Sequence, residues 1–108
     1  MLFRSHVDGD SVQLYRRPAR RHAPDTEFDL SCISAFPRVD IVYSYGGADG
    51  TAVDAFVAAG ARGIVSAGLA PGLTTPAERA AFERVAAAGV LVVQTSRAGS
   101  GRVARSSR

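Results

Sequence analysis

The stretch from Phe36 to Arg102 decides the fold, and it contains three candidate strands: VDIVYSY from Val39 to Tyr45, GIVSA from Gly63 to Ala67 and VLVVQT from Val90 to Thr95. Short apolar runs rich in β-branched and aromatic residues are typical of parallel strands that are buried on both faces. The segments between them have the length and composition of helices. The succession of strand, helix, strand, helix and strand predicts an α/β domain with a parallel sheet.

The ends of the two intervening helices carry recognisable signals. Thr75 to Glu78 places a capping hydroxyl, a proline at the first helical position and an acidic residue three after the cap, which predicts a helix start. Thr51 is the predicted cap of the earlier helix, and Gly60 and Gly89 are the predicted stops. The predicted inward-facing residues of the later helix are Phe82, Val85 and Ala86.

The first third of the chain predicts a different organisation. The turn dipeptide Asp8-Gly9 lies between alternating apolar residues, so Phe3 to Tyr15 is predicted to form a β-hairpin. The next segment is rich in proline and charge, which predicts a linker with at most a short helical turn near Leu30 to Ala35. The expected division is therefore a hairpin over 1–15, a linker over 16–37 and an α/β domain over 38–108, cut short where a further strand and helix would be expected.

Composition excludes several classes of protein. A chain of 108 residues has room for one modest core, and no apolar run approaches the roughly 20 residues that a membrane-spanning helix needs. We therefore expect no membrane partner. The single cysteine, Cys32, can form no internal disulfide and has no metal-ligand spacing to another Cys or His, so it is interpreted as packing, and no metal or cofactor is predicted. All basic residues are arginines, which excludes any mechanism that needs a lysine base.

The remaining motifs leave two other classes of function open. Gly46, Gly47 and Gly50 follow a strand and precede a helix, but their spacing is not G-x-G-x-x-G. Because the loop is nevertheless rich in glycine, the main alternative is a free-standing module that binds a nucleotide or phosphate through it. Four arginines between Tyr15 and His22 could form a nucleic-acid arm, although proline interrupts them and acidic residues follow. We interpret them as solvated or as paired with carboxylates of another domain, and we expect no nucleic-acid partner. Ser66 has the wrong glycine offsets for a serine hydrolase.

The three strand segments, taken together with the linker, resemble the bacterial L-asparaginases of the asparaginase/glutaminase family, most closely the type II, periplasmic-type branch. The resemblance covers most of the chain, and the order and spacing of the segments carry it. The matching segments are Pro37 to Tyr45, Gly63 to Gly68 and Thr95 to Val103, preceded by Tyr15 to His22, Asp25-Thr26 and Phe28-Asp29.

The resemblance implies a three-layer, Rossmann-like or flavodoxin-like parallel sheet, here as a partial C-terminal domain preceded by a hairpin and linker. It also implies an amidohydrolase that converts L-asparagine to L-aspartate and ammonia, with glutamine as a possible second substrate. The nucleophilic threonines of the family belong to T-G-G-T and T-D-G type motifs in its N-terminal domain, and this chain contains neither motif. We therefore expect no catalytic residue in this chain and no activity from it alone.

The resemblance further implies where the chain contributes to a site. In the family, an asparagine in the loop after the second strand reaches a neighbouring subunit's active site, but Pro71 occupies that position here. A second family contact, a glutamate, falls in a region after Arg108. The candidate substrate-binding residues are therefore Ala70, Pro71 and Gly72, in an intersubunit loop. The implied partners are the N-terminal domain and the neighbouring subunits of a homotetramer, and the implied compartment is the periplasm, with the cytoplasm as the alternative.

Overall fold

The computed structural model describes residues 5–16 and 19–104, and the chain divides into two compact units, Met1–Ala35 and Phe36–Arg108. In the first unit, β1 (Ser5–Asp8) pairs antiparallel with β2 (Ser11–Leu14). Gly9 has a φ of 59° in the turn between them, which confirms the predicted hairpin because glycine adopts a positive φ without steric cost. Parts of the segments named above, namely residues 1–4, 17–18 and 105–108, lie outside the described residues.

The linker contains the turn predicted near Leu30, and it also contains a short helix that the sequence did not predict. A short 3₁₀ helix, η1, spans Ala23–Asp25, whereas near Leu30 there is a single turn in which the backbone N–H of Ile33 donates to the carbonyl of Leu30 at 3.1 Å. Proline at position 24 explains the difference, because its fixed φ suits the first turn of a helix and its missing N–H is not needed there.

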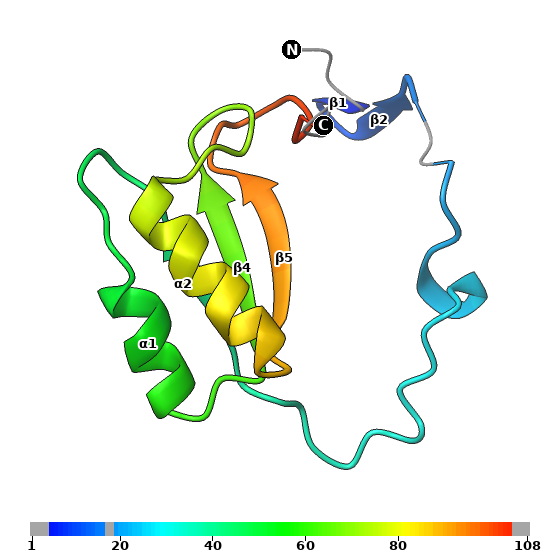
Figure 1. Ribbon diagram of the computed structural model, residues 1–108. Helices are drawn as coiled ribbons and strands as arrows, with labels where there is room; N and C mark the ends of the chain where they lie inside the picture. Colours follow the sequence, from blue (N-terminus) through cyan, green and yellow to red (C-terminus); the bar gives the residue numbers. More distant parts are fainter. Residues whose placement is uncertain (1–4, 17–18, 105–108) are drawn as a thin grey trace. The chain divides into compact units, whose positions relative to one another are not determined.

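The second unit is the predicted α/β domain. Its three strands are all parallel and lie side by side in the order β3-β4-β5, with a helix between each consecutive pair (Figure 1). This arrangement confirms the α/β fold and the parallel sheet. The elements in chain order are β3 (Val39–Tyr43), α1 (Thr51–Ala58), β4 (Gly63–Gly68), α2 (Pro76–Ala87) and β5 (Leu91–Ser96).

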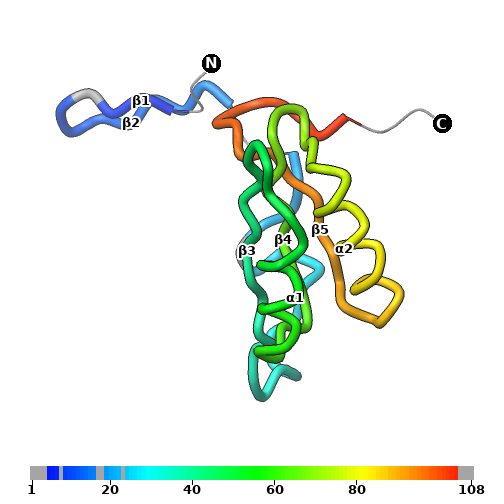
Figure 2. The backbone as a smooth tube through the Cα atoms, turned by 60° about the vertical axis from the view of Figure 1, so that its left-hand side comes forward, coloured from blue at the N-terminus to red at the C-terminus, as the bar shows by residue number. Residues whose placement is uncertain are grey.

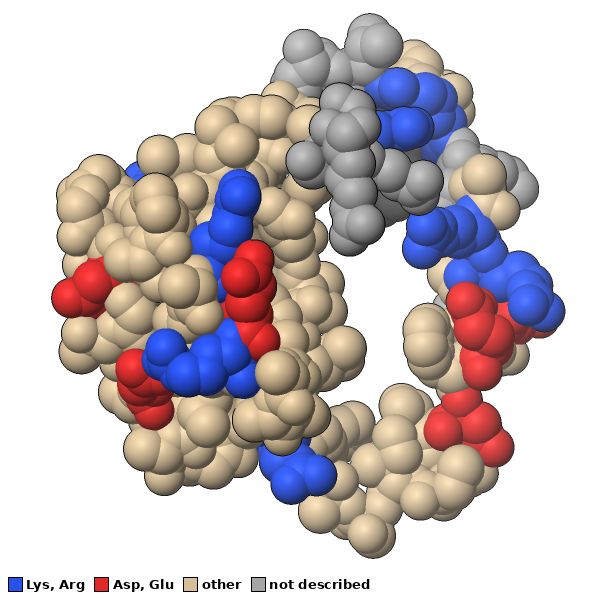
Figure 3. All heavy atoms as spheres, in the orientation of Figure 1, with Lys and Arg blue, Asp and Glu red and all other residues tan. Residues whose placement is uncertain are grey.

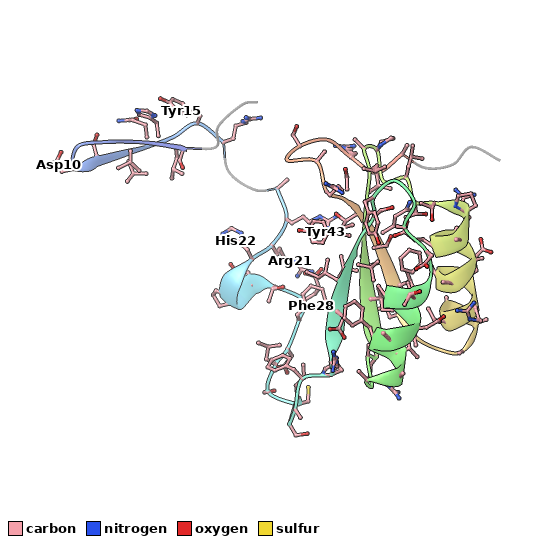
Figure 4. All side chains as sticks on the ribbon, turned by 90° about the vertical axis from the view of Figure 1, so that its left-hand side faces the viewer. Asp10, Tyr15, Arg21, His22, Phe28 and Tyr43 are labelled. Atoms are coloured by element: carbon pink, nitrogen blue, oxygen red, sulfur yellow. The ribbon has the colours of Figure 1, made fainter. Side chains whose placement is uncertain are left out.

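Both helices cover the same face of the sheet (Figure 4), and the backbone trace shows α2 running alongside β5 (Figure 2). Two right-handed crossovers that advance in the same direction place their helices on one side. Of the predicted three layers, the described residues thus form two. The core lies between them and consists of Val42, Val53, Ile64, Ala81, Phe82 and Val85.

The opposite face of the sheet is apolar and uncovered within the second unit. Ile41 and Tyr43 on β3 are 55% and 61% exposed, and Leu91 on β5 is 68% exposed. In Figure 4, Tyr43 projects from β3 on the side away from the helices. The prediction that Val39 to Tyr45 is buried on both faces is therefore wrong here, because α1 and α2 cover only the face of Val42 and Ser44.

The two helix starts have different origins. At α2 the prediction is confirmed: the Thr75 hydroxyl accepts from the backbone N–H of Glu78 at 3.1 Å, and the Glu78 carboxylate accepts from the N–H of Thr75 at 3.0 Å. At α1 the prediction of Thr51 as cap is wrong, since Gly50 is the N-cap residue and makes no side-chain bond. The carboxylate of Asp49 accepts the N–H of Thr51 at 3.0 Å instead.

The predicted ends of both helices are confirmed, but one of the three residues predicted to face the core is exposed. Gly60 and Gly89 have φ of 91° and 92° just after α1 and α2, where the left-handed conformation releases the chain from the helix. Ala86 is exposed and Ala81 is buried in its place. Ala81 is on the helical face of Phe82 and Val85 because residues three and four apart lie on one side of a helix.

Candidate functional site

The candidate site lies at the carboxyl edge of the parallel sheet, where three loops leave β3, β4 and β5. Open α/β sheets bind their ligands outside the carboxyl ends of the strands. The loops span residues 44–50, 69–75 and 97–103, and all belong to the second unit (Figure 1). The predicted site residues Ala70, Pro71 and Gly72 lie in the middle loop.

The middle loop is a tight turn held by its own backbone. The N–H of Leu69 donates to the carbonyl of Leu73 at 2.7 Å, and the N–H groups of Gly72 and Leu73 both donate to the carbonyl of Leu69 at 2.5 Å. The bond between Ala70 and Pro71 is cis. Ala70 and Pro71 are exposed, and Gly72 is buried. The three predicted site residues are therefore close in space, but only two of them present side chains to solvent.

Neighbouring segments occupy the carbonyl groups of this loop. The side-chain amide of Gln94 donates to the carbonyl of Gly72 at 2.6 Å, and the N–H of Ala104 donates to the carbonyl of Pro71 at 2.9 Å. Pro71 has no N–H and the N–H of Gly72 is used within the loop. The N–H of Ala70 has no hydrogen-bond partner among the described residues. It is therefore the backbone donor that this loop leaves available.

A cavity of about 520 Å³ lies beside the loop, on the helix-covered side of β5. Its polar side chains come from β4, the middle loop, α2 and β5, and Phe82 and Val92 form part of its apolar wall. Ser66 is its buried hydroxyl, but no histidine or carboxylate among the described residues bonds to that hydroxyl, so no activated nucleophile is present. The residues that line it are Ser66, Pro71, Gly72, Leu73, Thr74, Arg79, Phe82, Glu83, Val92, Gln94 and Ala104.

Ser44, Glu78 and Arg97 form a polar network at the same edge, which sequence reasoning missed. The buried hydroxyl of Ser44 donates to the carboxylate of Glu78 at 2.5 Å, and the guanidinium of Arg97 donates to the carbonyl of Ser44 at 2.5 Å. A usable signal was strand alternation: Val42 faces the helices, so the residue two further on faces them too. A polar residue at such a position requires a buried partner.

The glycine-rich loop after β3 does not form a phosphate site. A phosphate would need the free N–H groups at the start of α1, but the Asp49 carboxylate already accepts from Thr51. That hydrogen bond lowers the pKa of Asp49 below its usual range, so the carboxylate is charged at neutral pH and repels an anion. Glu78 lines the small cavity behind the same loop. These two acidic side chains disfavour the alternative of a nucleotide-binding module.

The charged side chains over α1 and α2 do not form a patch of one sign that would attract a polyanion. Over α1 and α2, acidic and basic side chains are interspersed in the view of Figure 3, and Arg84 forms an ion pair with Asp54 across the two helices. Within the part of the chain that the structure describes, no group of three His, Cys, Asp or Glu side chains could hold a metal ion. None of the described helices has the length and apolar character needed to cross a membrane.

A three-stranded parallel sheet with its loops gathered at the carboxyl edge defines the second unit as an α/β domain. Comparison with known families identifies the family of this domain. The sequence model of the Glutaminase/Asparaginase C-terminal domain matches residues 38–108, and the chain belongs to this family. The resemblance inferred from the sequence is thereby confirmed.

The relatives are named as asparaginases or glutaminase-asparaginases, and their alignments cover most of this chain. It is 37% identical over 95 residues to a glutaminase-asparaginase of Pseudomonas fluorescens biotype A, and 36% identical over 96 residues to L-asparaginase 2 of Escherichia coli strain K12. These alignments cover 88% and 89% of this chain but only 26% and 28% of the relatives. The chain thus spans about a quarter of the length of the curated relatives it matches.

A solved structure shows the same fold. The crystal structure of a probable cytoplasmic L-asparaginase from Campylobacter jejuni superposes with a TM-score of 0.84 and 31% sequence identity, over 95% of this chain and 34% of that one. A probable periplasmic L-asparaginase of Haemophilus influenzae is 32% identical over 100 residues. The relatives therefore include enzymes named for both compartments.

Proposed function

We propose that this chain is part of an L-asparaginase, and that the enzyme to which it contributes hydrolyses the side-chain amide of L-asparagine to L-aspartate and ammonia, with glutamine as a second substrate. The observation that carries the proposal is the match of residues 38–108, nearly the whole second unit, to the Glutaminase/Asparaginase C-terminal domain. The names of the relatives, which include both asparaginases and glutaminase-asparaginases, support this pair of substrates.

The proposed division of labour follows from the polar groups of the chain. Residues 1–15 would be the end of the N-terminal domain, 16–37 the interdomain linker and 38–108 part of the C-terminal domain. The nucleophile and its activating groups would come from the N-terminal domain, since the described residues of the candidate site offer binding groups and no activated nucleophile. The partners would be that domain and the neighbouring subunits of a homotetramer. We place the enzyme in the periplasm, on the type II resemblance.

The loop of Ala70, Pro71 and Gly72 would complete a neighbouring subunit's substrate site. Its support is geometric: the loop lies at the carboxyl edge, Gln94 and Ala104 bond to its carbonyl groups, and the N–H of the exposed Ala70 has no partner among the described residues. A backbone N–H can donate to a carboxylate or carbonyl oxygen of an amino acid, as the side-chain amide of an asparagine would. Ala70 would thus supply the contact that Pro71 cannot.

The first test uses the purified chain with L-asparagine and a coupled assay for ammonia. We expect no release above a control without protein, because positioning and binding groups alone do not replace a missing nucleophile. A longer protein that includes this sequence should release ammonia from asparagine. Turnover by the 108-residue chain, in preparations free of host asparaginase, would contradict the proposed division of labour.

The second test examines the loop in that longer enzyme. Replacing the exposed Ala70 by Tyr should raise KM for asparagine, with a loss of about 1–3 kcal/mol, because the bulky ring blocks a hydrogen-bond donor to the substrate. Ala77→Tyr is the matched control, since Ala77 is an equally small and exposed residue on α2. Steady-state kinetics and gel filtration decide the matter. Equal KM values for the two variants in correctly assembled enzyme would mean that the loop is only a connector.

A further inference from the structure

Ser44 is the residue at which the carboxyl ends of all three strands are joined. It is 1% exposed, and each of its polar groups bonds to a different segment. Its N–H donates to the carbonyl of Ala67 on β4 at 3.0 Å, its hydroxyl donates to Glu78 on α2, and its carbonyl accepts from Arg97 just after β5. The N–H of Arg97 also donates to the carbonyl of Gly68 at 2.8 Å.

Glu78 does more than cap its helix. A capping glutamate needs only the N–H of the cap residue and ordinarily keeps its carboxylate in water. The Glu78 residue is 1% exposed, and the same oxygen, Oε2, accepts from both the N–H of Thr75 and the hydroxyl of Ser44. Burying a carboxylate without hydrogen-bond partners destabilises the folded state. The hydrogen bonds from the Ser44 hydroxyl and the Thr75 N–H offset this loss.

The network reaches both loops that flank the candidate site. Thr75 ends the loop that contains Ala70, and its hydroxyl donates to the carbonyl of Ala48 in the loop after β3 at 2.7 Å. The downstream end of the middle loop is thus attached to α2 through Glu78 and to the first loop through Ala48. A displacement of Glu78 would remove the acceptor of the Thr75 N–H, and a displacement of Ser44 would remove the hydroxyl that helps to fix this carboxylate. Either change would loosen the downstream end of the loop.

We propose that Ser44 and Glu78 are positioning residues that hold the loop from Leu69 to Thr75 in the shape seen in this structure. Their consequence for substrate binding rests on the function proposed above, while their effect on the loop does not. A pair of apolar side chains could fill the same space, but it would not fix an orientation, whereas a satisfied hydrogen-bond network does. The network therefore serves the geometry of the loop more than the free energy of folding.

The test is amide hydrogen exchange by NMR on the 108-residue chain. Ser44→Ala removes the donor and Glu78→Leu removes the acceptor at similar volume, so both should raise exchange of the Gly72 and Leu73 amides by about 10-fold relative to amides between β4 and β5. Glu78→Gln keeps an acceptor oxygen for both donors and should restore the wild-type rates. Asp54→Asn is the matched control, because it breaks the exposed pair with Arg84 on the same two helices without touching a loop.

Two results would overturn the proposal: unchanged exchange at Gly72 and Leu73 in both variants, or a uniform rise throughout the sheet. If either single variant fails to fold, the double variant Ser44→Ala, Glu78→Leu removes the hydroxyl and the carboxylate together, so that only the part-buried N–H of Thr75 loses its acceptor, and the same amides decide. In the longer enzyme the variants should raise KM for asparagine more than they lower kcat. Failure of the wild-type enzyme to hydrolyse asparagine would refute the proposed function and leave the exchange result standing.

Discussion

Gly72 is the residue whose replacement the structure tolerates least in the candidate loop. Its φ is 105°, which favours glycine, and a Cβ at this position would lie 2.8 Å from Cγ1 of Val103. Gly47 has a similar φ of 84°, but its Cβ would meet nothing within 4 Å. The two glycines therefore separate the cost of backbone conformation from the cost of a close approach.

We predict that Gly72→Ala destabilises the chain more than Gly47→Ala. Each should lose about 1–3 kcal/mol for the positive φ, and Gly72→Ala should lose a further 1–3 kcal/mol or so because Val103 must move away from the loop. Urea unfolding followed by circular dichroism measures both. Equal losses in the two variants would show that the contact with Val103 does not constrain the loop.

At the scale of elements, the sequence is sufficient where local chemistry alone sets the structure. The start of α2 follows from Thr75, Pro76 and Glu78, which act within one helical turn. The start of α1 does not, because Gly50 adopts a helical conformation and Asp49 captures the first N–H. A threonine before an apolar helix is a candidate cap, but only the conformation of the preceding residues decides whether it occupies the cap position.

We predict that Thr75→Ala costs about 1–2 kcal/mol of stability, because the variant loses a side-chain cap and leaves the N–H of Glu78 without its acceptor. Thr51→Ala is the control at the other helix. It should change stability by less than roughly 0.5 kcal/mol, since Thr51 is exposed and alanine is a better helix former. Thermal and urea unfolding of the two variants measure this difference. A loss of stability in Thr51→Ala as large as that in Thr75→Ala would show that Thr51 caps α1 after all.

At the scale of the whole molecule, sequence patterns predicted the strands, their order in the chain and their parallel pairing, because each crossover is set by local segments. They did not predict which faces are covered. A continuous apolar strand is typical of burial on both sides, but coverage depends on which elements pack against the sheet. The candidate loop was proposed from the resemblance to the family, whereas the partners of Ser44, separated from it by many residues, required the three-dimensional structure.

We predict that the uncovered sheet face makes the chain associate in solution, since large exposed apolar surfaces promote contact between molecules. Replacing Ile41 or Val93 on this face by Lys should reduce association. Ala58→Lys adds the same charge at an exposed position on α1 and should leave association unchanged. Sedimentation velocity over a range of concentrations tests the prediction. A wild-type chain that remains monomeric throughout would refute it.

The central position of β4 also governs the order in which this unit can assemble. Among the described strands, β3 and β5 pair only with β4, so neither outer strand acquires a ladder until β4 is in place. Each pairing closes a chain segment no longer than a single helix and its turns, and contacts at short sequence separation carry a small loop-closure entropy. The folding nucleus should therefore contain β4 with one outer strand and its connecting helix, while the second helix and strand add to an existing template.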